Sequence, residues 1–282
     1  PGMMDTVLNV GIDEQVITGL ARRLDPTFAL DCLRRFAQMY GRIVLGIDDA
    51  HLSCTIDAAI ASGEAALATG QDGALEATVE RTRAIIASFG QTLPADPVQQ
   101  LHGAILAVFR SWNTPRAVAY RRAHGIPDDL GTAVNVQSMV FGNMGDDCAT
   151  GVAFTRNPAT GENVLYGEYL VNAQGEDVVA GIRTPKPIQE MKKEMPKIYR
   201  ELERVRKILE EHFREVQDFE FTVEKGTLYI LQTRNGKMNA QAIVRTSNDM
   251  VSEKLISKEK AVLRLKPQEL EQLLHKRIDP NF

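Results

Sequence analysis

The stretch from Asp218 to Arg234 constrains the fold most, because polar and apolar residues alternate on both sides of a turn signal. Successive side chains of a β-strand point to opposite faces of a sheet. The predicted loop spans residues 224–226, a length that places Asp218 opposite Gln232. With that loop, one face of the hairpin carries four polar side chains, those of Asp218, Glu220, Gln232 and Arg234.

Two carboxylates, a carboxamide oxygen and a guanidinium on one rigid face are suited to holding Mg2+ bound to a polyphosphate. Mg2+ prefers oxygen ligands, and the planar guanidinium of arginine binds phosphate oxygens through two parallel hydrogen bonds. An ordinary solvent-exposed hairpin, with Asp218 and Arg234 as a cross-strand pair, is the alternative. These residues alone leave both interpretations open.

The apolar face of the hairpin needs a partner, and the preceding segment predicts one. Residues 197–216 have the spacing of an amphipathic helix. Phe219, Phe221 and Leu231 are expected to pack against this helix. Further strands are predicted from the apolar runs at 133–140, 151–155 and 164–172. Strands on either side of a helix predict an α+β fold, with the helix on one face of the sheet and a ligand on the other.

The first part of the chain is predicted to be helical. Asp13 and Asp25 are candidate helix N-caps, and the helical pattern continues to about residue 89 and again over 98–122. Arg116, Arg121 and Arg122 gather near the end of the second helical stretch. We expect them on a solvent-exposed helix face, since the sequence does not place them near the hairpin.

Composition excludes several classes of protein. The 282 residues carry a formal net charge of -4, so no general excess of cations is present to bind a nucleic acid. Three distant cysteines predict neither a disulfide framework nor a zinc site, and they fit a reducing, cytoplasmic setting. No apolar run reaches the ~18 residues that a membrane helix needs, so we expect no membrane partner.

Several blocks resemble, in the same order, the nucleotide-binding region of the pyruvate, phosphate dikinase family, a region with an ATP-grasp nucleotide site. The resemblance covers nearly the whole chain. The blocks are R-R-F-A-Q-M-Y at 34–40, A-V-F-R-S-W at 107–112, G-T-A-V-N-V-Q at 131–137, G-V-A-F-T-R-N-P-A-T-G-E at 151–162, G-E-Y-L-V-N-A-Q-G-E-D-V-V-A-G at 167–181 and L-Q-T-R-N-G-K at 231–237.

The resemblance implies an ATP-grasp-like α+β fold with an inserted helical subdomain and a C-terminal helical linker. Residues 1–140 would form part of the first ATP-grasp subdomain, including a helical insertion at about 13–93. Residues 141–237 would form the second subdomain, which carries the metal and phosphate hairpin, and 238–282 the linker. In the family this linker leads to a swivelling phosphohistidine domain.

The resemblance also implies roles for individual residues. It assigns Mg2+ binding to Asp218, Glu220 and Gln232, and catalytic roles to Arg234 and Glu176. Glu176 is expected on a strand that faces the hairpin, with an ordinary loop carboxylate as the alternative. The nucleotide-binding set comprises Gly2, Thr150, Gly151, Glu176, Asp218, Glu220, Gln232 and Arg234. Within it, Gly2, Thr150 and Gly151 resemble loop positions that face phosphate.

The implied substrate is ATP, bound with Mg2+. The full-length enzymes interconvert ATP, phosphate and pyruvate with AMP, pyrophosphate and phosphoenolpyruvate, through a phosphohistidine. They are phosphotransferases and homodimers whose phosphohistidine and pyruvate-binding domains lie on the same polypeptide. This chain lacks the sequence context of the carrier histidine, so we expect it to be inactive alone. A monomer is one possible state of the chain. The alternatives are a phosphoenolpyruvate synthase-type nucleotide domain and a non-catalytic nucleotide-binding module.

Overall fold

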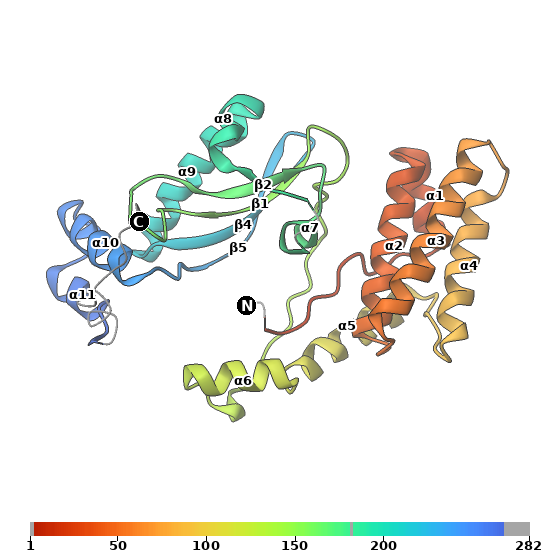
Figure 1. Cartoon of the computed structure of the whole chain (residues 1–282), viewed down its shortest axis with the longest axis horizontal. Helices are drawn as coiled ribbons and strands as arrows, with labels where there is room; N and C mark the ends of the chain where they lie inside the picture. Colours follow the sequence, from red (N-terminus) through yellow and green to blue (C-terminus); the bar gives the residue numbers. More distant parts are fainter. Residues whose placement is uncertain (1–2, 181–182, 268–282) are drawn as a thin grey trace, which may run out of the picture. The chain divides into compact units, whose positions relative to one another are not determined.

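A computed structural model describes residues 3–180 and 183–267 of the chain, without the side chains of residues 179 and 180. It forms two compact units, Pro1–Met139 and Val140–Phe282 (Figure 1). The described residues combine helices with a five-stranded antiparallel sheet, which is the predicted α+β class. Gly2, one of the predicted phosphate-facing residues, lies outside the described part of the chain.

The first unit is helical. Asp13 and Asp25 are N-caps as predicted, since their side chains accept hydrogen bonds from the backbone N–H groups of Val16 and Phe28, at 2.7 and 2.9 Å. Its helices are α1 (Glu14–Arg23), α2 (Pro26–Ile43), α3 (Asp49–Ala68), α4 (Ala74–Ser88), α5 (Pro97–Ser111), α6 (Pro115–His124) and the short 3-10 helix η1 (Asp128–Leu130). Helices α1 to α4 pack side by side as a bundle (Figure 1).

The prediction of a strand over 133–140 is wrong. In the structure this stretch has no regular secondary structure and pairs with no described strand, and Val136 is 63% exposed. β-Branched residues favour extended backbone, but a strand also requires a neighbour that accepts and donates its backbone hydrogen bonds.

The expectation of solvent exposure is wrong for Arg121. Its side chain is 4% exposed, lies over the Trp112 ring with 4.1 Å between the guanidinium carbon and the ring centroid, and pairs with Asp128 at 2.7 Å. Arg116 and Arg122 are exposed as expected. The cation–π contact and the ion pair therefore give Arg121 a structural role at the end of α6.

The second unit is built on one antiparallel sheet of order β3-β2-β1-β4-β5. Two strands form where they were predicted, at β1 and β2. The strands are β1 (Ala149–Phe154), β2 (Tyr166–Val171), β3 (Lys186–Pro187), β4 (Gln217–Glu224) and β5 (Thr227–Asn235). The helices are α7 (Gly175–Ala180), η2 (Ile188–Glu190), α8 (Met191–Glu194), α9 (Pro196–Phe213), α10 (Ala240–Ser252) and α11 (Lys258–Leu263).

Helix α9 covers one face of this sheet, as the apolar pattern predicts. Phe219 and Phe221 are fully buried in a cluster that includes Ile198 and Leu202 of α9. Leu231 differs from the expectation, because it is only half-buried. Helix α7 lies on the other side of the sheet (Figure 1). The sheet therefore has a packed core face and a second face that carries polar side chains.

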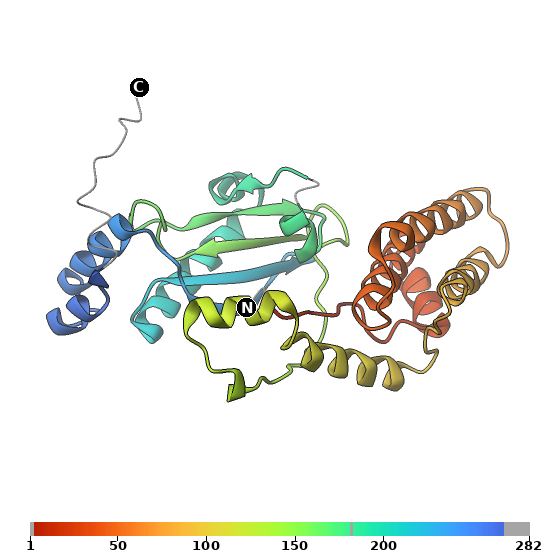
Figure 2. The same cartoon turned by 60° about the horizontal axis from the view of Figure 1, so that its bottom comes forward.

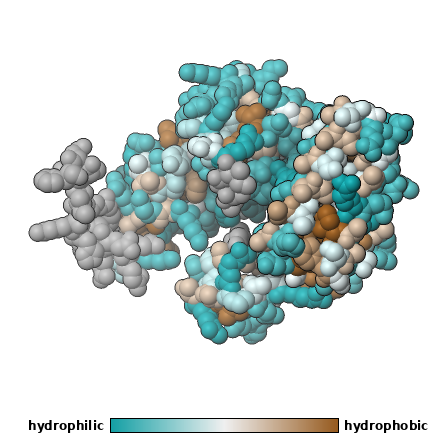
Figure 3. Space-filling view, turned by 45° about the vertical axis from the view of Figure 1, so that its right-hand side comes forward, coloured by the Kyte–Doolittle hydropathy of each residue, from teal (hydrophilic) through white to brown (hydrophobic). Residues whose placement is uncertain are grey.

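Helices α10 and α11 follow the hairpin and lie beyond one end of the sheet (Figure 2). Val216, Met250 and Ile256 form a small buried cluster between them and the start of β4. No helix of the described residues is long and apolar enough to span a membrane. The surface drawn in Figure 3 is largely hydrophilic, with apolar residues in small groups.

Candidate functional site

The turn of the β4–β5 hairpin has two residues instead of the predicted three. Glu224 pairs with Thr227, so only Lys225 and Gly226 form the loop. Both have positive φ, at 48° and 71°. Positive φ at both central positions is typical of a type I′ turn, whose twist matches that of the two strands.

A β-bulge restores the predicted arrangement of the side chains. Phe221 pairs with Ile230 but Glu220 pairs with Gln232, which leaves Leu231 as the extra residue. Without this bulge, a two-residue turn would place Gln232 opposite Phe219 and so on the core face. The one-residue shift moves Gln232 to the polar face. The four predicted residues therefore share one face, by a route that the sequence did not indicate.

Direct contacts join these four residues in two pairs. Gln232 donates a hydrogen bond from its Nε2 to the Glu220 carboxylate. The Nε atom of Arg234 lies 2.7 Å from Oδ2 of Asp218. Asp218 is thus opposite Arg234, whereas the sequence predicted Gln232. The terminal Nη groups of Arg234 and the amide oxygen of Gln232 take no part in these two bonds.

Burial differs along this row of side chains. The Asp218 side chain is 12% exposed and that of Arg234 is 39% exposed. Glu220 is half-buried, and Gln232 is exposed. A partly buried carboxylate next to an arginine interacts more strongly than a fully solvated pair, because the surrounding dielectric is lower. Asp218 therefore fixes one edge of the Arg234 guanidinium, while the other edge can reach a ligand.

Thr150 and Gly151 do not lie in a loop, contrary to the expectation. Both are in β1, whose residues pair with β2 on one side and β4 on the other. The Thr150 hydroxyl donates to the backbone oxygen of Phe221 at 3.3 Å. A Cβ on Gly151 would lie 2.6 Å from both the Phe221 ring and the backbone oxygen of Glu168. The core thus accounts for Gly151, whereas Thr150 lies on the opposite face of the sheet, and the nucleotide-binding roles of both residues stay predictions.

Glu176 lies in the first turn of the short helix α7 rather than on a strand. Its side chain is half-buried. A Cβ on the preceding Gly175 would be 3.9 Å from Oγ1 of Thr150, which faces away from the core. Helix α7 therefore begins over the same face of the sheet as the Asp218–Arg234 row. Helix α7 contacts β1 and β2, so Glu176 at its start lies near this face, on the β1–β2 side of the hairpin.

One further carboxylate on this face was missed. Val152 of β1 pairs with Glu220 on one side and with Glu168 of β2 on the other. Directly opposite residues of antiparallel strands point to the same face, so the exposed Glu168 shares the face of Glu220. The alternation of buried Tyr169 with Glu168 is the signal that could have identified it.

The donor set fits Mg2+ held jointly by protein and phosphate. Among the described residues, no three His, Cys, Asp or Glu side chains converge into an all-protein metal site. Mg2+ commonly takes only one or two carboxylates, with phosphate oxygens and waters as the remaining ligands. Glu220, the amide oxygen of Gln232 and the nearby Asp218 can supply that number of oxygens.

The matching family model and the similar proteins point to the same family. Residues 1–201 and 192–255 match the family model described as pyruvate phosphate dikinase, AMP/ATP-binding domain. The chain is 49% identical over 284 residues to pyruvate, phosphate dikinase of Clostridium symbiosum, covering 99% of this chain and 32% of that protein. It is 50% identical over 300 residues to pyruvate, phosphate dikinase of Rhizobium meliloti, covering 100% of this chain and 33% of that protein. The chain therefore spans about one third of the length of these relatives.

Proposed function

The chain belongs to the family of pyruvate phosphate dikinase AMP/ATP-binding domains, and on this premise we propose that its β4–β5 hairpin binds the phosphates of Mg–ATP. One observation carries the proposal. Asp218, Glu220, Gln232 and Arg234 share the face of the sheet that α9 does not cover, and they contact one another in pairs across the hairpin.

Arg234 would bind the transferred phosphates. Asp218 holds its Nε edge at 2.7 Å, so the Nη groups remain available for two phosphate oxygens. A guanidinium fixed in this way loses little conformational freedom when the ligand binds. We propose Glu176 as the second catalytic residue, on the support of its position at the start of α7 over the same face.

Glu220 and Gln232 would hold Mg2+, with Asp218 close enough to bind the metal or order its waters. When bound, Mg2+ neutralises charge on the phosphates of the nucleotide. The hydrogen bond from Gln232 to Glu220 keeps the two side chains adjacent. Rotation of the Gln232 amide would turn its oxygen toward Glu220, so that both side chains could bind one cation.

The reaction that we propose for the whole protein is phosphoryl transfer from ATP to a histidine on another domain, and then to pyruvate. In such transfers, positioning and charge neutralisation provide most of the catalysis. The chain spans about one third of the length of three relatives named pyruvate, phosphate dikinase, and this supports further domains as partners. We also propose that the second unit includes the second ATP-grasp subdomain. Three free thiols support a cytoplasmic protein.

Isothermal titration of the chain with Mg–ATP tests the proposal. We expect saturable heat with the unmodified chain and a loss of affinity of about tenfold or more in Glu220→Gln, because one charged ligand is removed. Glu201→Gln is the matched control, since Glu201 lies on α9 and is remote from the polar face of the sheet. Its affinity should equal that of the unmodified chain.

Two results would contradict the proposal. The first is an absence of heat with a folded chain, which would favour an interaction module without a nucleotide site. The second is an equal affinity in Glu220→Gln and Glu201→Gln, which would place the site elsewhere. Thermal melting of the same samples separates either result from misfolding.

A further inference from the structure

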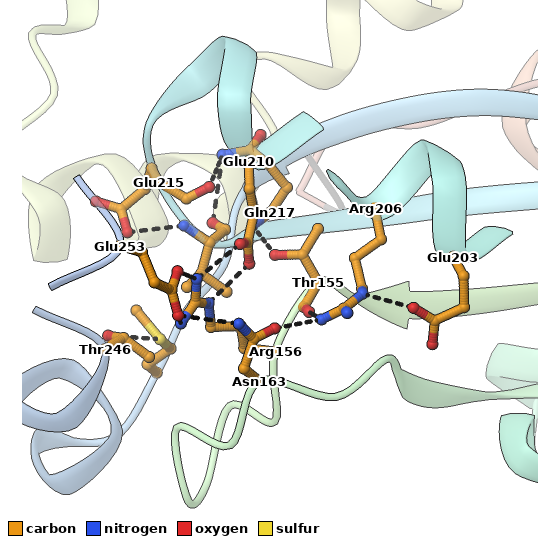
Figure 4. A network of polar contacts seen from close by, with 12 residues as sticks. Thr155, Arg156, Asn163, Glu203, Arg206, Glu210, Glu215, Gln217, Thr246 and Glu253 are labelled. Atoms are coloured by element: carbon orange, nitrogen blue, oxygen red, sulfur yellow. Dashed lines mark hydrogen bonds and ion pairs between the residues drawn. The ribbon is translucent and has the colours of Figure 1, made fainter. Parts of the chain in front are cut away.

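A buried arginine joins three elements of the second unit at one end of the sheet (Figure 4). Arg156 follows β1, and its side chain has no exposed surface. Its Nε and Nη2 donate to the carboxylate of Glu210 on α9, at 3.0 and 2.9 Å. Its Nη1 and Nη2 donate to the carboxylate of Glu253, directly after α10, at 3.2 and 2.5 Å. One guanidinium therefore fastens the end of α10 to α9 and to the sheet.

One buried positive charge meets two carboxylates at this junction. Burial by itself lowers the pKa of Arg156, but hydrogen bonds and charge from Glu210 and Glu253 outweigh that effect and raise it, so the guanidinium stays charged. Glu253 also accepts a hydrogen bond from Asn163 at 3.0 Å. When Glu253 moves away, Glu210 still balances the charge of Arg156, but the N–H groups that donate to Glu253 are left buried without an acceptor. Separation of α10 from α9 is therefore unfavourable.

A second arginine makes a similar junction after α11. The Nε atom of Arg264 donates to Oε2 of Glu215 at 2.8 Å, and its Nη1 donates to the Ser247 hydroxyl of α10 at 2.9 Å. The Arg264 side chain is 7% exposed. Glu215 lies between α9 and β4. Arg264 thus ties the end of α11 both to α10 and to the segment that leads into the hairpin.

These junctions are continuous with the strands of the candidate site. Gly236, just after β5, donates its N–H to the backbone oxygen of Val216 at 2.7 Å. Gln217 of β4 accepts from the N–H of Thr155 at 2.8 Å. Thr155 precedes Arg156, and Val216 belongs to the buried cluster with Met250 of α10. The contacts of the two arginines therefore lie on the same stretches of backbone as the residues next to Asp218 and Arg234.

We propose that Arg156 and Arg264 clamp α10 and α11 to the sheet, so that residues 240–264 form a rigid arm of the second unit. This differs from the flexible role that a linker over 238–282 would have. A displacement of the hairpin would carry the arm with it. The arm is thereby a mechanical connection between the β4–β5 hairpin and the chain segment after α11.

Hydrogen–deuterium exchange of the intact chain, read by mass spectrometry without nucleotide, tests this arrangement. In the unmodified chain, α10 amides should be protected to within about tenfold of β4 amides, because a rigid arm opens only with the unit. Glu253→Gln should accelerate exchange in α10 by about tenfold or more relative to β4. Glu211→Gln, a neighbouring exposed carboxylate on α9 outside both clamps, should leave this ratio unchanged.

Arg264→Gln provides a second, independent variant, and it should accelerate exchange in α11 and α10 in the same way. Glu253 and Arg264 are chosen because replacement of the fully buried Arg156 risks loss of the fold. The proposal is overturned when α10 of the unmodified chain exchanges about a hundredfold faster than β4, or when neither variant changes the ratio of α10 to β4 exchange. Nucleotide binding does not enter this readout, so its outcome is independent of the proposed function.

Discussion

Gly151→Ala tests whether this glycine serves the core or a phosphate. The added Cβ would lie 2.6 Å from the Cζ atom of Phe221 and 2.6 Å from the backbone oxygen of Glu168. Neither neighbour can move easily, because Phe221 is fully buried and Glu168 belongs to the adjacent strand β2. Overpacking in a core typically costs about 1 to 3 kcal/mol. With two rigid contacts we expect the upper end, ~3 kcal/mol.

For a unit of this size, that loss corresponds to a fall in Tm of roughly 6 to 12 °C. Calorimetry gives the shift, and hydrogen exchange of β1 and β4 peptides assigns the transition to the second unit. Gly175→Ala is the matched control in the same unit, since its Cβ would make only an ordinary contact at 3.9 Å. We expect its Tm to stay within about 2 °C.

A companion variant isolates the contact with the ring. In a Phe221→Leu background, Gly151→Ala should cost about 1 kcal/mol less than in the unmodified chain, because neighbouring substitutions are not additive. The reasoning is refuted if Gly151→Ala keeps its Tm while Mg–ATP affinity falls. That result would mean that Gly151 is required for close approach of a phosphate.

Three further predictions follow from the second unit. Phe221→Ala should lower the free energy of unfolding by about 3 to 5 kcal/mol in urea titration, since the ring is fully buried on the core face; a loss below ~1 kcal/mol would contradict that assignment. Lys225→Gly should raise stability by up to about 1 kcal/mol, because Lys225 has φ of 48° in the turn, and a clear loss in thermal melting would be inconsistent with a type I′ turn. Burial raises the pKa of Glu253, but hydrogen bonding and charge from Arg156 outweigh this and lower it below its ordinary value of 4.5. Its stabilising contribution should be present above that value and lost as pH falls through the lowered pKa, and pH-dependent urea melts of Glu253→Gln should lack this component.

Local periodicity was sufficient for much of the second unit. Alternation in β4 identified Phe219 and Phe221 as core residues, and the 3.6-residue period of α9 identified their partner. These features depend on each segment's own pattern, because burial of one face requires apolar residues at the period of that element. Asp13 and Asp25 could be recognised as caps for the same reason, since a capping side chain acts within three residues.

The turn and the bulge were decided by the folded hairpin. Both a two-residue and a three-residue loop fit the sequence around Gly226, and the bulge at Leu231 compensates for the shorter one. The correct set of polar residues was thus predicted from an incorrect register. The shorter turn and the bulge each shift the pairing by one residue, and the resulting two-residue shift leaves every side chain on its predicted face, because side chains alternate with period two. Residues 133–140 show the opposite outcome. Their sequence favours a strand, but no described strand pairs with them.

The ion pairs of Arg156 depended most on tertiary structure. Its partners Glu210 and Glu253 are 54 and 97 residues away, and no local pattern marks an arginine after a strand as one that will be fully buried. Strands, faces and caps follow from interactions within a few residues, which the sequence by itself contains. The burial of Arg156, the packing of Gly151 against Phe221 and the position of α10 depend on which distant segments meet, and only the three-dimensional fold decides that.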